Sequence, residues 1–214
     1  MSKFSDWTKQ RLERTFGLRR LKTLPDLEDW LNSDVTIEPQ EKMFVEYLLQ
    51  ISADRMDDWN EEELKFKFIG PLVTTVNFET EHFSAFANRT LQGVINGETL
   101  NGLPDLMVAA GRQDPEMPYF CLHEYKKESG SDGDPGGQCL AAMLVAQERN
   151  LPHGFPIYGC YVIGRFWFFM ILKGKEYAVS IGHNAGKNEI FDIFKALKTL
   201  KINITKQYFD LKVA

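Results

Sequence analysis

The sequence predicts an α/β fold in which a mixed central sheet is flanked by helices and preceded by a helical N-terminal appendage. Apolar residues recur at helical spacing as far as about residue 73, and later stretches alternate between strand-like and helix-like patterns. This order of elements is typical of an α/β domain with a mixed sheet. With 43% hydrophobic and 13% aromatic residues, the 214-residue chain can bury a full core, which argues against intrinsic disorder.

The first part of the chain reads as a set of short helices. Trp7, Trp30 and Tyr47 lie in stretches where apolar residues follow helical spacing, and prolines separate these stretches. Because so many large apolar groups are costly to leave in water, we expect the helices to dock on the rest of the protein. The expected division is therefore a helical appendage over residues 1–58 and a main domain over residues 59–214.

A stronger helix is expected over Asn60–Val73. Asn60 is a favourable N-cap residue, and Glu63 would complete a capping box with it. The strand-like runs follow residue 75, and two of them are expected to be neighbours in one sheet, Leu106–Ala110 and Phe120–Lys126. An earlier strand or hairpin is expected over 83–97, with turns at Asn96-Gly97 and Asn101-Gly102.

The second half of the chain adds a helix, a hairpin and a final helix. Asp134 followed by Pro135 is typical of a helix start, and that helix should run to about Arg149. Gly164-Arg165 reads as a tight turn between two strands. The other expected elements are strands over Ile157–Ile163, Phe166–Leu172 and Glu176–Ser180, and a helix over Glu189–Leu200.

Charged residues inside one expected strand carry the functional hypothesis. Strand alternation places Phe120, Leu122, Glu124 and Lys126 on one face, so an acid and a base share a face with two apolar residues. Such charges are costly to bury unless they are paired or bind a metal. Asp105 opens the preceding strand, and neighbouring strands would bring its carboxylate beside Glu124.

Two carboxylates and a lysine suit phosphoryl chemistry. Carboxylate oxygens hold a hard divalent cation, with water completing its coordination. The cation lowers the pKa of a bound water and stabilises charge on phosphate oxygens, and the lysine ammonium can orient the water or steady the phosphorus centre. The alternative is a structural ion pair between Glu124 and Lys126 at a strand end.

The context of these residues resembles the PD-(D/E)XK nuclease superfamily. Gly102-Leu103-Pro104-Asp105 lies nineteen residues before Glu124-Tyr125-Lys126, and a Gly-rich loop and a helix bearing Gln138 follow. The helix from Asn60 resembles the opening helix of restriction-enzyme nuclease domains, and the stretch from Tyr158 to Phe169 is similar to a late hairpin of type I restriction enzymes. The resemblance covers roughly half of the chain.

The resemblance implies a restriction-endonuclease-like fold, a DNA substrate and Mg²⁺ as the metal, with Mn²⁺ as a substitute. It implies catalytic roles for Asp105, Glu124, Lys126 and Gln138, and metal ligation by Glu61, Asp105 and Glu124. Glu61 has an alternative role, since acids in a first helical turn complement the helix dipole. Gln138 also has an alternative interpretation, as a surface residue near the start of a helix.

Charge and targeting features limit the remaining choices. The net charge of −5 argues against a sequence-independent nucleic-acid coat, although residues 1–22 carry seven Lys/Arg against two acids. That basic segment is either a solvated helix face or a contact for DNA or for a protein partner, a second copy included. The N-terminus lacks the apolar stretch of a signal peptide and no run is long enough to span a membrane, so we expect a cytoplasmic protein with no membrane partner and three reduced cysteines.

The hypothesis from sequence is thus a Mg²⁺-dependent DNA endonuclease-like enzyme. The main alternative is a non-catalytic nucleic-acid- or protein-binding module that keeps the same fold. A third is a metal-dependent enzyme that acts on another substrate, because one fold hosts many functions.

Overall fold

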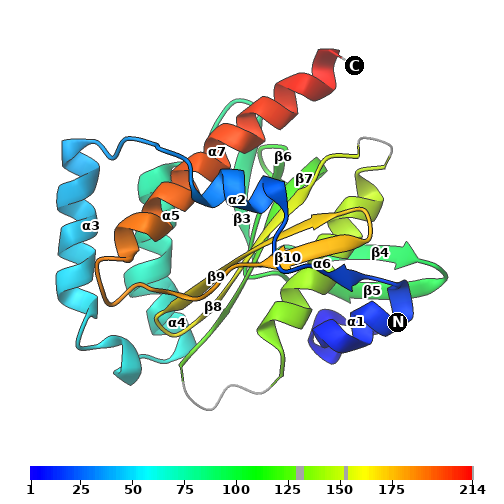
Figure 1. The fold of residues 1–214 in the computed structure, drawn as a ribbon, viewed down its shortest axis with the longest axis horizontal. Helices are drawn as coiled ribbons and strands as arrows, with labels where there is room; N and C mark the ends of the chain where they lie inside the picture. The colour runs from blue at the N-terminus through cyan, green and yellow to red at the C-terminus, as the bar shows by residue number, and fades with distance from the viewer. Residues whose placement is uncertain (129–132, 152–153, 214) are drawn as a thin grey trace.

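A computed structural model describes residues 1–128, 133–151 and 154–213. Helices cover both faces of a large twisted sheet, and a smaller sheet lies beside it (Figure 1). The helices are α1 (Lys9–Phe16), α2 (Pro25–Leu31), α3 (Pro39–Ser52), α4 (Glu61–Leu64), a π-helical turn (Lys65–Ile69), α5 (Gly70–Val76), α6 (Pro135–Arg149) and α7 (Ile190–Val213), with short 3-10 helices at Phe4–Asp6 and Met56–Asp58.

The strands fall into two sheets within the described residues. The large sheet has the order β2-β10-β9-β8-β7-β6-β3, with β11 also paired to β9, and the small sheet has the order β1-β5-β4. Their bounds are β1 (Ser2–Lys3), β2 (Arg19–Arg20), β3 (Phe83–Ala87), β4 (Leu91–Ile95), β5 (Glu98–Gly102), β6 (Leu106–Ala110), β7 (Glu116–Lys126), β8 (Ile157–Ile163), β9 (Phe166–Lys173), β10 (Glu176–Val179) and β11 (His183–Asn184).

The centre of the large sheet confirms the expected neighbours. Strand β6 lies antiparallel between β3 and β7, and β8 lies parallel to β7 on its other side. The α6 helix connects β7 to β8, as a parallel pair requires. The α/β class with a mixed, helix-flanked sheet is therefore confirmed.

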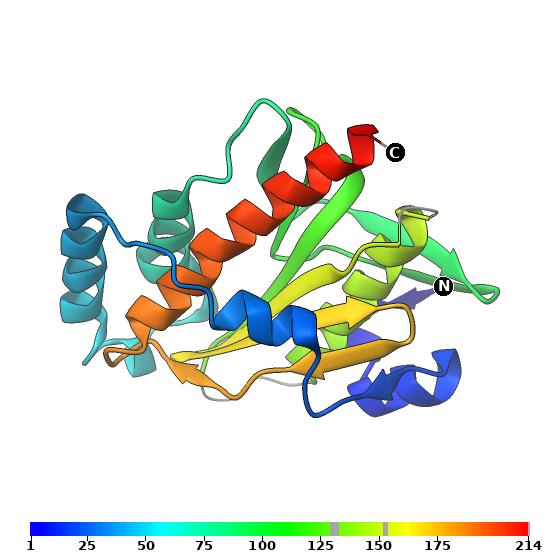
Figure 2. The same cartoon turned by 45° about the horizontal axis from the view of Figure 1, so that its top comes forward.

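Helices on opposite faces divide the core into two clusters of buried residues. One cluster joins the sheet to α2, α3, α5 and α7, and the other joins it to α1, α6 and the small sheet. Figure 2 shows α7 lying across one face of the large sheet while α6 lies on the other. No helix in the described residues combines the length and the apolar character needed to cross a lipid bilayer.

The α6 helix follows its local sequence signals closely. Asp134 accepts a hydrogen bond from the backbone N–H of Gly137, Pro135 occupies the first turn, and the helix ends at Arg149 as predicted. The α7 helix is longer than the expected Glu189–Leu200, since it continues to Val213. In its second half Ile204 is buried but Ile202 and Phe209 are exposed, so the apolar residues there do not all lie on one buried face.

The stretch 83–97 is extended as expected, since β3 and β4 both lie within it, but the expected hairpin is wrong, because these two strands belong to different sheets. Between them Asn88 adopts a positive φ of 50°, and β4 then pairs with β5 through the predicted turn at Asn96-Gly97. Both turn residues have positive φ, as a tight hairpin turn of this kind needs. The second expected turn is also wrong: Gly102 ends β5, where a Cβ would overlap the ring of Phe4.

The N-terminal residues are part of both cores. Phe4 and Leu12 belong to the cluster under α6, whereas Trp30 and Leu48 belong to the cluster under α7. Strand β1 extends the small sheet beside β5, and β2 extends the large sheet beside β10. The expectation of a purely helical appendage is therefore corrected, because residues 1–58 also contribute strands to both sheets. Each of these strands is too short, at two residues, to leave a periodic pattern.

Candidate active site

Asp105 is fixed directly beside β7 by the antiparallel pairing of β6 and β7. Leu106 pairs with His123, so Asp105 stands at the end of β6 next to the last residues of β7. Its Oδ2 accepts a hydrogen bond of 2.7 Å from the backbone N–H of Tyr125. Only 10% of the Asp105 side chain is exposed, which makes its orientation part of the fold.

Glu124 is the buried acid of the site. Its side chain is 4% exposed, and its Oε1 lies 3.0 Å from Nζ of Lys126. Burial, helped by repulsion from Asp105, raises the pKa of Glu124 to about 7, although Lys126 acts in the opposite direction. Glu124 is therefore close to half protonated at neutral pH, unlike an ordinary surface glutamate.

The strand face of these residues differs in one respect from the prediction. Glu124 and Lys126 share a face with Leu122, but Phe120 belongs to the opposite core cluster together with Cys121. The register shifts here, because Val108 pairs with Cys121 and the next residue of β6 pairs with Tyr119. Phe120 is thus an extra, unpaired residue, and this bulge reverses the alternation before the motif.

Glu61 reaches the same site from the start of α4. The helix begins with the predicted capping box between Asn60 and Glu63, and Glu61 occupies its first turn. Oε2 of Glu61 lies 3.5 Å from Nζ of Lys126. Partial burial acts to raise the pKa of Glu61, but hydrogen bonds and attraction from Lys65 and Lys126 hold it below its ordinary value.

Lys65 is a member of the site that the sequence analysis missed. Its Nζ lies 2.8 Å from Oδ1 of Asp105 and 2.7 Å from Oε1 of Glu61, and it also contacts Glu62 at 3.2 Å. Although burial alone would lower it, the pKa of Lys65 is raised by these carboxylates. The spacing of four residues between Glu61 and Lys65 indicates a helical ion pair, but the contact with Asp105 depends on the tertiary fold.

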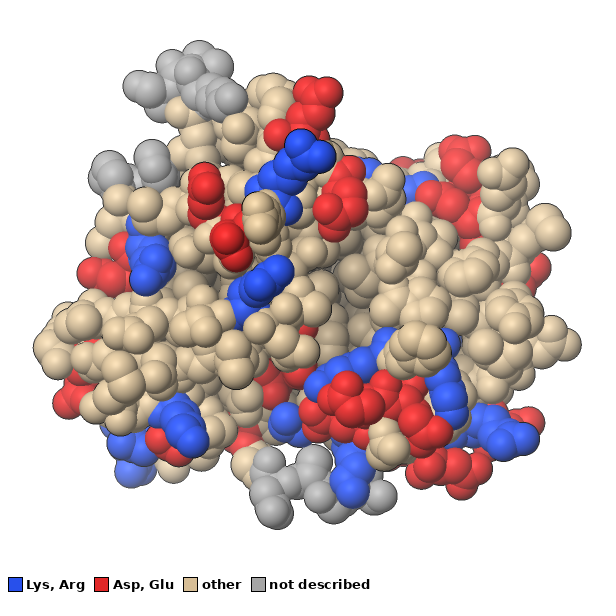
Figure 3. Space-filling model, turned by 180° about the vertical axis from the view of Figure 1, so that it is seen from behind, with Lys and Arg blue, Asp and Glu red and all other residues tan. Residues whose placement is uncertain are grey.

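These five residues form what we call the charged cluster: Glu61, Lys65, Asp105, Glu124 and Lys126. It combines three carboxyl groups with two ammonium groups, so full ionisation leaves one negative charge in excess. Figure 3 shows acidic and basic side chains gathered together on the face of the molecule where α4 lies. The cluster thus has a net charge of −1 when Glu124 is ionised and no net charge when Glu124 holds its proton.

The carboxylates of the cluster are not arranged as a set of three metal ligands. No group of three or more His, Cys, Asp or Glu side chains in the described residues is arranged to hold a metal ion. Glu61 is instead occupied by two lysines. Mg²⁺ commonly binds through one or two carboxylates and keeps several waters. Both oxygens of Asp105 already have partners, Lys65 and the backbone N–H of Tyr125, so ligation by Asp105 together with Glu124 would replace the contact with Lys65 and stays a prediction. Ligation by Glu61 stays a prediction.

Gln138 lies apart from the charged cluster. It occupies the first turn of α6 and lines a separate hollow of about 380 Å³ with Phe4 and Leu103. Within the described residues, no hydrogen bond joins its side chain to Glu124 or Lys126. The structure therefore brings together four of the five predicted site residues and leaves Gln138 outside their contacts.

His123 lies on the strand face opposite Glu124 and contacts Tyr125, whose backbone holds Asp105. It is 1% exposed, and its Nδ1 lies 2.7 Å from the hydroxyl of Tyr125. Burial lowers the pKa of His123 to about 3, so the ring is neutral at physiological pH. Since the backbone N–H of Tyr125 holds Asp105, the contact between His123 and Tyr125 helps to position that acid.

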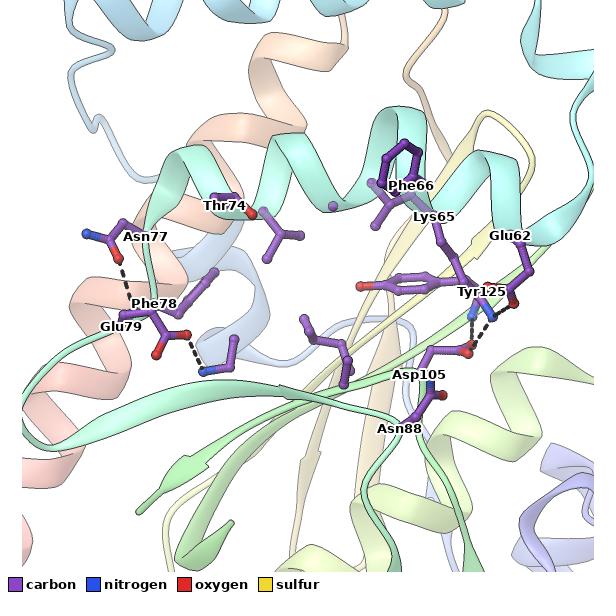
Figure 4. Close-up of a pocket in the computed structure, with 16 residues that line it drawn as sticks. Glu62, Lys65, Phe66, Thr74, Asn77, Phe78, Glu79, Asn88, Asp105 and Tyr125 are labelled. Atoms are coloured by element: carbon purple, nitrogen blue, oxygen red, sulfur yellow. Dashed lines mark hydrogen bonds and ion pairs between the residues drawn. The ribbon is translucent and has the colours of Figure 1, made fainter. Parts of the chain in front are cut away.

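A pocket of about 430 Å³ opens beside the cluster, between the α4–α5 helix and strands β3 and β6. Figure 4 shows Lys65 and Asp105 at one end of it and Asn77 at the other. Comparison with known proteins gives no relative on which to base a role for this region. No protein-family model matches the chain, and no curated protein has a significantly similar sequence.

Proposed function

We propose that this protein is a Mg²⁺-dependent nuclease that cleaves phosphodiester bonds of DNA at the charged cluster. The observation that carries the proposal is the placement of Asp105 and Glu124 at the same end of two neighbouring strands, with the Lys126 ammonium 3.0 Å from Glu124. An acid pair with an adjacent lysine is the arrangement expected of metal-assisted phosphodiester hydrolysis.

The order of elements supports the likeness to PD-(D/E)XK nucleases. A helix is followed by the antiparallel strands β3, β6 and β7, and then by α6 and the parallel strand β8. The two motif acids lie just before β6 and near the end of β7. A restriction-endonuclease-like fold is therefore part of the proposal, together with the role of the motif.

Asp105 and Glu124 would hold the metal through carboxylate oxygens, and Mn²⁺ would serve in place of Mg²⁺. When bound, the metal supplies an acidified water and charge stabilisation on the phosphate oxygens. The protein contributes the orientation of these two acids: Asp105 is held by the N–H of Tyr125 and by Lys65. Lys126 is placed to orient the attacking water or to donate a hydrogen bond to a phosphate oxygen.

The test is a cleavage assay on supercoiled and linear DNA with Mg²⁺, Mn²⁺ or EDTA. We expect cleavage with either metal and none with EDTA. Lys126→Ala should lower the rate by about 10²-fold or more, as expected for loss of a group that stabilises transition-state charge. The loss of its pair with the buried Glu124 also lowers the melting temperature, so cleavage is measured at a temperature where the variant is folded. The matched control is Lys127→Ala, which removes a neighbouring lysine that makes no ion pair among the described residues. Cleavage that survives Lys126→Ala would contradict the assignment.

A non-catalytic binding module is the second candidate, and one observation favours it. Each carboxylate of the charged cluster already has an ammonium partner, so the cluster can serve as a structural ion-pair network. In that case DNA or protein binding would be unaffected by EDTA, and Lys126→Ala would lower the melting temperature because it leaves Glu124 buried without its partner.

A further inference from the structure

The pocket beside the charged cluster shares two residues with it. Lys65 and Asp105 belong both to the cluster and to the lining of the 430 Å³ pocket. A ligand that places a phosphate at the cluster therefore has an adjoining space for the group attached to that phosphate. The volume lies within the range of about 300–1,000 Å³ that small-molecule sites occupy.

The walls of the pocket are apolar and partly aromatic. Ile69, Val73 and Leu106 line it, and the ring of Tyr125 is held in place by the hydrogen bond between its hydroxyl and His123. Figure 4 shows that ring lying along the pocket between the helix and Asp105. A fixed aromatic ring and aliphatic walls suit a flat, largely apolar group such as a nucleobase.

The rim of the pocket carries an exposed aromatic side chain. Phe66 is 83% exposed, although it lies one residue from the largely buried Lys65. Both residues belong to the π-helical turn, which ends where the N–H of Gly70 bonds to the carbonyl of Lys65. Such turns occur frequently at functional sites. Thr74 and Asn88 add exposed polar groups around the same opening, and these can pair with the polar edge of a base.

We propose that this pocket binds an unpaired nucleobase of single-stranded DNA next to the phosphodiester at the charged cluster. The inference rests on the proposed nuclease function and specifies its substrate as a strand with an unpaired nucleotide at the cleavage point. A base within a duplex is stacked and paired, so it reaches such a pocket only when the strand is single or the base is extruded. Phe66 stacks on the base at the rim, and Tyr125 forms the inner wall.

The test compares binding of two single-stranded oligonucleotides in EDTA, where no cleavage occurs. One carries a single 2-aminopurine, and the other has an abasic site at the same position. We expect the intact strand to bind more tightly and its 2-aminopurine fluorescence to change on binding. Phe66→Ala should weaken binding of the intact strand by about 5- to 150-fold, the range for loss of one base–aromatic stack, and should leave the abasic strand unaffected.

Two further variants separate the pocket from general effects. Thr74→Trp, at an exposed position of α5, should fill the pocket and abolish the preference for the intact strand. Phe209→Ala is the matched control, because Phe209 is 48% exposed on α7 and does not line the pocket. Both proteins should keep the wild-type melting temperature.

Equal binding of the intact and abasic strands, or no effect of Phe66→Ala, would overturn the inference. A cleavage assay with Mg²⁺ on the same strands distinguishes this from failure of the proposed function. Cleavage without base-dependent binding removes the pocket proposal alone. Base-dependent binding without cleavage in any divalent metal removes the nuclease proposal and leaves a nucleobase-binding module.

Discussion

Replacing Glu124 with glutamine should relieve a pH-dependent penalty on folding. Burial raises the pKa of Glu124 from 4.5 to about 7, so the unfolded chain releases this proton at a lower pH than the folded protein does. Below pH 4.5 both states hold the proton and the penalty vanishes. As the pH rises from 4.5 to about 7 the penalty grows, and above that it is fully present.

The size of this loss of folding stability follows from the difference between the pKa of Glu124 in the unfolded and in the folded protein. A rise in pKa from 4.5 to about 7 corresponds to roughly 3 kcal/mol in the free energy of unfolding. Because the side chain is only 4% exposed, solvent screens this effect little. Glutamine keeps the shape of the side chain and cannot ionise. The attraction between Lys126 and the ionised carboxylate is already included in this difference, because it opposes the rise of the pKa.

The assay is urea unfolding at pH 5 and pH 8 in EDTA, with two-state behaviour checked by two probes. The stability of Glu124→Gln relative to wild type should increase by about 2–3 kcal/mol between these pH values. Glu62→Gln, at an 82% exposed neighbour, is the control and should show no such trend. A constant difference at both pH values would refute the burial argument. A variant that becomes relatively less stable at pH 8 would show that Lys126 outweighs the burial.

Three other substitutions test the support around the site. His123→Gln should remove a contribution of the opposite sign: the folded-state pKa of about 3 lies below the ordinary 6.5, so stability from this residue is full above 6.5 and falls by roughly 2 kcal/mol between pH 7 and pH 5. Since Glu124 acts in the other direction over an overlapping range, the readout is again the difference between variant and wild type in urea. Trp30→Ala should cost about 3–5 kcal/mol in chemical unfolding, because the ring is 1% exposed and its Nε1 donates to the carbonyl of Ala196, whereas Tyr47→Ala, at a 54% exposed position, should cost little. A loss of stability for Trp30→Ala as small as that for Tyr47→Ala would show that residues 1–58 are not integrated in the core. Gly137→Ala should lower the melting temperature through a loss of about 1–3 kcal/mol, since its Cβ would lie 2.5 Å from the carbonyl oxygen of Trp7 and 2.8 Å from the backbone nitrogen of Lys9, and an unchanged melting curve would contradict this backbone contact.

Features set by neighbouring residues could be predicted from the sequence. The caps at Asn60 and Asp134 act on their own first turns, so both helix starts were predicted correctly. Strands β6 and β7 are apolar enough to be recognised alone, and their pairing brings Asp105 to the end of β7 beside Glu124. The prediction that Asp105, Glu124 and Lys126 lie together therefore required only that two adjacent strands be recognised and paired.

Features that depend on distant contacts could not be predicted in this way. The bulge at Phe120 arises from the register against β6, and the strand alternation alone predicts the wrong face for that residue. The sequence predicts only that Lys65 pairs with Glu61 along the helix, whereas in the fold Nζ of Lys65 also lies 2.8 Å from Oδ1 of Asp105. The same contact changes the expected electrostatics, because Asp105 is paired with an ammonium group as well as repelled by Glu124.

The π-helical turn at Lys65–Ile69 has a consequence for how this site tolerates changes in chain length. A π turn accommodates one residue more than an α-helical turn, so α4 and α5 are out of phase by one position. Deleting one residue from the turn would give a regular helix, yet it would rotate the α4 end by about 100° relative to the α5 face. Glu61 would then point away from Lys126, while the buried side chains of α5 stayed in place. A shortened helix of this kind should fold well and still lose the cluster, so the extra residue is required by the site and not by the helix.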